Sequence, residues 1–167
     1  MSAPVRNLFQ HLPPPAECLA LCIATLELVP FGVAGLRNPA TFADGYGLPI
    51  TGAPVTSLSS TQRTDSRSTA TSGASEDEMN TKKALVAAVA ARNMQNGILL
   101  FIFGLLLRDR RSLGVAVTAG LVATITDTVI VKTFGAKDKI GGHYLGVFNS
   151  LAVGGSLLYW GSSDALW

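Results

Sequence analysis

The sequence predicts an all-α protein, a four-helix transmembrane bundle with a long polar loop between helices 1 and 2. Hydrophobic residues make up 48% of the 167 residues and charged residues only 14%, an unusual balance for a protein dissolved in water. The apolar residues are also segregated, because charge is almost absent from residues 17–36, 84–107, 113–132 and 143–160. Each segment has about the 17–25 residues with which a helix crosses the hydrocarbon core.

Two other classes of protein are disfavoured by the same residues. A soluble helical bundle would carry a polar stripe on each helix, whereas residues 99–107 are apolar on every side. The net charge is only +2 and the basic residues are scattered, which argues against a nucleic-acid partner. We therefore expect a multi-pass integral membrane protein whose partner is the lipid bilayer, in a eukaryotic cell most naturally the endoplasmic reticulum membrane.

The first half of the chain is expected to hold one span and two irregular segments. Residues 1–15 form an N-terminal tail, because Pro13, Pro14 and Pro15 stop a helix from extending backwards. The span 17–36 is followed by turn-forming residues, which indicate a re-entrant or interfacial loop. Residues 51–81 are polar and poor in large apolar side chains, so they predict a disordered loop.

The second half is expected to hold three spans joined by short connections. Residues 108–111 connect the spans 84–107 and 113–132 so tightly that these helices must be antiparallel neighbours. Glycines at 135, 141 and 142 turn the chain into the span 143–160, which ends at interfacial aromatic residues. Residues 162–167 form a C-terminal tail.

Four ionisable residues lie within or at the ends of these spans, namely Glu27, Arg92, Asp127 and His143. Burying such a group in a bilayer costs roughly 2.5–3.5 kcal/mol, so each indicates a partner or a polar cavity. Because successive spans run in opposite directions, all four lie in the same half of the bilayer or near its middle. We expect a single polar pocket, open towards the loop at residues 135–142.

Two interpretations of this pocket remain open. Arg92 could pair with Asp127 or with Glu27 as a structural lock between helices. Alternatively, Asp127, His143, Arg92 and Glu27 are catalytic acid–base groups, with Asn93, Asn96 and Tyr144 as substrate-binding residues. No cofactor motif and no metal-binding motif is visible, so neither group is expected.

Several short motifs resemble one family. They are Arg92-Asn93 with Gly97, residues 109–114, Asp127 with Ile130-Val131, Gly142-His143, and Pro39 with residues 45–49. Together they resemble the domain of unknown function 4267 family over most of residues 20–161. The resemblance implies a four-helix membrane protein of the kind found in fungi and bacteria, where some fungal members lie among genes for secondary metabolites. It also points to Arg92, Asp127 and His143. The chain departs from the usual family pattern at Asn93, where an acidic residue is common, and in its long polar loop.

These observations lead to two functional hypotheses. The first is a cofactor-independent enzyme of isomerase, cyclase or dehydratase type, or an accessory protein, acting on a lipophilic small molecule in secondary-metabolite biosynthesis. In it Asp127 and His143 exchange protons with the substrate and Arg92 orients an oxygen. The second is a non-enzymatic scaffold, a partner subunit of a membrane enzyme, or a small transporter assembled as a homo-oligomer. A cavity of roughly 300 Å³ or more beside the polar groups would favour the enzyme.

Overall fold

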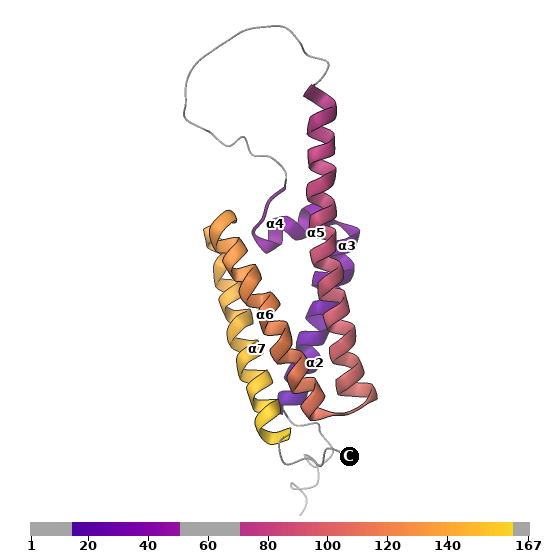
Figure 1. Cartoon of the computed structure of the whole chain (residues 1–167), viewed down its shortest axis with the longest axis vertical. Coiled ribbons are helices and arrows are strands. Elements are labelled where there is room, and N and C mark those ends of the chain that lie inside the picture. The colour runs from indigo at the N-terminus through magenta and orange to yellow at the C-terminus, as the bar shows by residue number, and fades with distance from the viewer. Residues whose placement is uncertain (1–14, 51–70, 162–167) are drawn as a thin grey trace, which may run out of the picture.

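The computed structural model describes residues 15–50 and 71–161, with side chains described from residue 76 in the second range. These residues form several long helices together with shorter helical segments (Figure 1). The elements in chain order are α2 (Pro15–Leu26), η1 (Glu27–Val33), α3 (Ala34–Arg37), α4 (Pro39–Tyr46), α5 (Thr71–Phe101), η2 (Ile102–Leu106), α6 (Arg110–Phe134), η3 (Lys137–Lys139) and α7 (Ile140–Gly161). The all-α prediction is confirmed.

Within the described residues, three helices are long and apolar enough to cross a membrane: Pro15–Arg37, Glu76–Leu106 and Arg110–Phe134. Many large apolar side chains on their outer faces are exposed, among them Leu105, Leu106 and Val122, as lipid-facing residues are. Helix α7 has 22 residues but contains His143, Asn149 and several glycines, and it is not among the three. The composition is that of a multi-pass membrane protein.

The helices pack in two pairs that lie against each other. Helix α6 runs alongside α7, and the α2–η1–α3 helix runs alongside α5 (Figure 1). Glycines permit both contacts: a Cβ on Gly154 of α7 would lie 2.6 Å from the hydroxyl oxygen of Thr118 in α6, and one on Gly97 of α5 would lie 2.7 Å from the backbone nitrogen of Leu28 in the first helix. Such close approach is how helices associate without a hydrophobic driving force between them.

The apolar core lies at the end of the bundle near the α5–α6 connection. It contains Ala20, Ala24, Leu100, Leu113, Val117, Val153 and Leu157. At the same end Arg110 Nε donates to Glu17 Oε1 at 2.6 Å, which joins the start of α6 to the start of α2. This end is therefore closely packed, and it leaves the other half of the bundle as the place for a cavity.

The first helix changes its winding at Glu27, where the π-helical segment η1 begins. Pro30 lies inside this segment and has no N–H to donate to the carbonyl four residues earlier. A wider helical turn avoids the clash between the proline ring and that carbonyl. Single π-helical turns are frequent at functional sites, and this one places an acidic residue at its first position.

The prediction of a disordered loop over residues 51–81 is wrong for the last part of that range. Helix α5 already begins at Thr71, whereas residues 51–70 lie outside the described part of the chain. Glu78 and Lys82 form an i,i+4 ion pair at 2.5 Å, and the hydroxyl of Thr81 donates to the carbonyl of Asp77. Extending an existing helix needs no new nucleus, so these residues are helical without burying apolar surface. The extension projects beyond α4 (Figure 1).

The expected loop after the first span contains a short helix, α4. The side chain of Asn38 accepts a hydrogen bond from the backbone N–H of Thr41 at 3.3 Å, and Pro39 occupies the first turn. Gly47 ends the helix in the left-handed conformation, with φ of 92°. Asn-Pro and Gly signal helix ends as well as turns, so a turn interpretation missed the helix between them.

Asp109 caps the N-terminus of α6. Its carboxylate accepts hydrogen bonds from the backbone N–H groups of Arg111 and Ser112 and from the Ser112 hydroxyl, and these bonds lower the pKa of Asp109. Asp109→Ala should reduce the free energy of unfolding by about 1 kcal/mol, measured by denaturation in bicelles. The cap is present above the ordinary pKa of 3.8 and is lost as the pH falls through the lower folded pKa.

Asp109→Asn is the control, because its side-chain oxygen still accepts from the helix N-terminus. The asparagine variant should retain most of the stability at neutral pH and lose the acid sensitivity. Equal stability of the alanine variant and the unchanged protein would contradict the capping role.

Candidate active site

A cavity of about 280 Å³ lies between the helices, in the half of the bundle away from the apolar core. Its apolar wall includes Ile23, Leu26 and Phe31, and its polar wall includes Glu27, Arg92, Asn93, Asn96, Thr124, Asp127 and Ser150. Tyr46, Lys139, Gly142 and His143 line the end near α4 and the start of α7. The volume is close to the lower limit of about 300 Å³ for ligand pockets.

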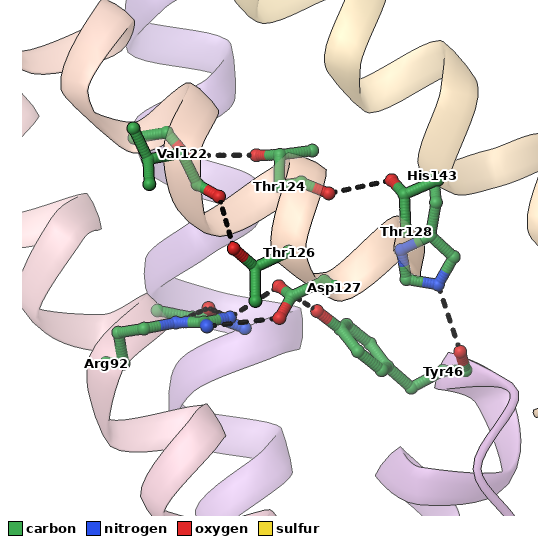
Figure 2. A network of polar contacts seen from close by, with 10 residues as sticks. Tyr46, Arg92, Val122, Thr124, Thr126, Asp127, Thr128 and His143 are labelled. Atoms are coloured by element: carbon green, nitrogen blue, oxygen red, sulfur yellow. Dashed lines mark hydrogen bonds and ion pairs between the residues drawn. The ribbon is translucent and has the colours of Figure 1, made fainter. Parts of the chain in front are cut away.

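Arg92 and Asp127 form the central polar contact (Figure 2). One guanidinium nitrogen of Arg92 donates to Asp127 Oδ1 at 3.1 Å and the other donates to Oδ2 at 2.6 Å. The same guanidinium also donates to the side-chain oxygen of Asn93, at 3.1 Å from its terminal nitrogen. This bidentate pair joins α5 to α6 and satisfies a carboxylate that is only 9% exposed.

Tyr46 joins the same cluster from outside the spans. Its hydroxyl, at the end of α4, donates a hydrogen bond to Asp127 Oδ2 (Figure 2). Burial and this hydrogen bond raise the pKa of Tyr46 well above its usual range, so the phenol stays protonated and donates at physiological pH. Three donor groups therefore converge on the Asp127 carboxylate, which leaves it little capacity to accept a proton from a ligand.

His143 contacts the same tyrosine from the start of α7. Its Nε2 lies 3.1 Å from the backbone carbonyl oxygen of Tyr46, and the two rings meet edge to face with centroids 4.8 Å apart (Figure 2). Since a carbonyl oxygen only accepts, Nε2 carries the proton. In the neutral imidazole, Nδ1 is then unprotonated and able to accept one.

Glu27 lines the same cavity from the first position of the π-helical segment η1. Its Oε2 atom is buried and has no hydrogen-bond partner among the described residues. The sequence left open whether Arg92 pairs with Asp127 or with Glu27. In the structure the Arg92 guanidinium pairs with Asp127. A buried carboxyl oxygen without a partner normally requires one, since burial removes its contacts with water.

The structure brings six of the seven predicted site residues to the cavity. Glu27, Arg92, Asp127, His143, Asn93 and Asn96 all line it. Tyr144 does not line it and is 51% exposed, because it follows His143 in the helix and faces another direction. Tyr144 is therefore not a cavity residue.

Sequence reasoning missed Tyr46, Lys139, Asn149 and Ser150, which also line the cavity. The sequence prediction rests on ionisable groups within the spans, and Tyr46 lies outside them. The one signal for it was the motif of residues 45–49. Uncharged Asn149 and Ser150 have no sequence feature that separates them from helix-packing residues.

No group of three His, Cys, Asp or Glu side chains in the described part of the chain is arranged to hold a metal ion. The side chains that line the cavity carry carboxyl, imidazole, phenol, amide, hydroxyl, guanidinium and ammonium groups. These groups move protons and orient polar ligand atoms.

Comparison with known proteins identifies a matching family. Residues 25–157 match the family model described as domain of unknown function (DUF4267), and this range contains all of the polar residues that line the cavity. No curated protein and no solved structure matches the chain. Because the match covers more than half of the sequence, the chain belongs to the family described as domain of unknown function (DUF4267).

Proposed function

We propose that this protein is a four-span membrane enzyme that binds a small lipophilic molecule in the cavity and acts on it by acid–base chemistry without a cofactor. The single observation that carries the proposal is the cavity of about 280 Å³ with the carboxyl group of Glu27 on one wall and His143 at one end. Helix α7 completes the cavity and is the fourth span in this proposal. Isomerisation, cyclisation and dehydration all need only a proton donor and a proton acceptor.

The contacts favour different roles from those expected for the polar residues. Asp127 is held by Arg92 and Tyr46, so we assign the pair Arg92–Asp127 to positioning. Glu27 Oε2 has no partner among the described residues, and His143 Nδ1 is free of the Tyr46 contact, so these two groups exchange protons with the substrate.

Replacing either proton-transfer group should abolish turnover. In a strain lacking the gene, complementation with Glu27→Gln or His143→Ala should leave the product at least about 100-fold below the level restored by the unchanged gene. The readout is metabolite profiling, together with protein abundance in microsomes. Glu78→Gln is the matched control, because Glu78 lies on the exposed extension of α5 and should restore the product fully.

A second candidate function is a non-enzymatic scaffold or partner subunit, favoured by the direct pairing of Arg92 with Asp127. A scaffold needs the fold and this lock between helices but no proton transfer. Full complementation by Glu27→Gln and His143→Ala at normal protein abundance would support the scaffold and reject the enzyme.

A further inference from the structure

A second, much smaller void adjoins the cavity on the side of the apolar core. Its volume is about 20 Å³, which is enough for one water-sized group. It shares six lining residues with the cavity, which are Ile23, Glu27, Asn96, Gly120, Thr124 and Ser150. Its other lining residues are Leu99, Leu100, Ala116 and Val117. The void is thus the deep end of the cavity, away from Tyr46 and His143.

The polar groups around this void have unused hydrogen-bonding capacity. Glu27 Oε2 is buried without a partner among the described residues. Asn96 offers an amide that both donates and accepts, and Ser150, a residue only 9% exposed, offers a hydroxyl. Thr124 uses its hydroxyl hydrogen on the carbonyl of Gly120, at 3.2 Å, so its oxygen remains an acceptor. An acceptor and a donor therefore face the same oxygen-sized space.

We propose that this deep end is a hydroxyl-binding subsite and that the ligand is a lipophilic alcohol. Its hydroxyl donates to Glu27 Oε2 and accepts from the Asn96 amide, while its hydrocarbon body fills the cavity against Leu26 and Phe31. A ketone has no hydrogen-bond donor to offer the ionised Glu27 carboxylate. A carboxylate would place a second negative group against the Glu27 carboxyl. This subsite rests on the proposed function, whose substrate class it names.

The test compares matched probes on the full-length protein in lipid nanodiscs. Cyclodecanol, cyclodecanone and cyclodecane share one ring and differ only in donor and acceptor groups. Their dissociation constants follow from the shift of the thermal unfolding midpoint with probe concentration. We expect the alcohol to bind at least about tenfold more tightly than the ketone, because only the alcohol gives the buried carboxyl oxygen a donor.

Substitutions of two asparagine residues, Asn96 and Asn149, test whether the preference for the alcohol comes from the void. Asn96 lines both the cavity and the void, whereas Asn149 lines the cavity alone. Asn96→Ala and Glu27→Ala should reduce the alcohol-to-ketone preference to about twofold or less. Asn149→Ala should change the affinities for alcohol and ketone by the same factor. Ala123→Phe places a ring in the cavity and should remove the binding of every probe. Any shift of the unfolding midpoint that remains in this variant measures the effect of the probe on the bilayer.

The outcomes separate the subsite from the cavity. Equal binding of alcohol and ketone, as expected if a water molecule occupies the void, would overturn the subsite and leave the cavity as a binding site. Equal loss of preference in Asn96→Ala and Asn149→Ala would also overturn it. Absence of a response to all three probes would count against the subsite and against the proposed ligand-binding function together.

Discussion

Replacing Asp127 by alanine should destabilise the protein more than any other single change in the site, by about 3–5 kcal/mol in the free energy of unfolding. The change leaves the Arg92 guanidinium without its bidentate partner and the Tyr46 hydroxyl without its acceptor. An uncompensated charge inside a bundle is costly because neither water nor another group replaces the lost contacts. Equilibrium unfolding in bicelles with increasing sodium dodecyl sulfate measures the effect.

The control removes both charges. Arg92→Met combined with Asp127→Leu leaves no unpaired ion and should recover most of the lost stability, because paired buried ions contribute little over apolar residues of similar volume. A double variant as unstable as Asp127→Ala would show that the loss comes from altered packing. It would contradict the assignment of Arg92–Asp127 as an ion pair between α5 and α6.

Replacing Gly97 by valine should have the second largest effect, a loss of about 2–3 kcal/mol. A Cβ at this position would lie 2.7 Å from the backbone nitrogen of Leu28 and 2.8 Å from the backbone oxygen of Ala24. These are backbone atoms of the first helix, so no side-chain rotation relieves the overlap, and the two helices must move apart. The same unfolding assay in bicelles measures the loss.

Gly155 provides a matched control in another helix. A Cβ there would meet no atom within 4 Å. Gly155→Val should therefore change the stability by less than about 0.5 kcal/mol, as substitutions away from packed contacts do. Similar losses of stability for the two variants would mean that the low helix propensity of valine causes the loss in both helices. The close contact at Gly97 would then not explain it.

The positions of the first and third spanning helices followed from the sequence to within a few residues. The first was expected at 17–36 and is Pro15–Arg37, and the third was expected at 113–132 and is Arg110–Phe134. Apolar length and turn residues are local properties, so a single chain displays them directly. Helix α4 and the early start of α5 were missed, because capping and helix extension depend on backbone geometry that composition does not report.

The common location of the polar residues could also be predicted, because alternating helix direction brings Glu27, Arg92, Asp127 and His143 to one half of the bundle. Which of these residues form an ion pair could not be predicted from the sequence. Whether Arg92 reaches Asp127 or Glu27 depends on how each helix is rotated about its axis, which the spacing of residues along the chain does not determine. The π-helical turn at Pro30 adds a further rotation to the first helix.

The sequence by itself thus determined an all-helical chain with apolar segments of membrane-spanning length and a cluster of ionisable groups at one depth. Only the tertiary structure decided that Asp127 is held by Arg92 and Tyr46, that Glu27 Oε2 is left without a partner among the described residues, and that both residues line one cavity. The physical reason is that helix formation and apolar burial depend on neighbouring residues. Hydrogen-bond partners and voids depend on side chains from distant segments meeting within about 3 Å.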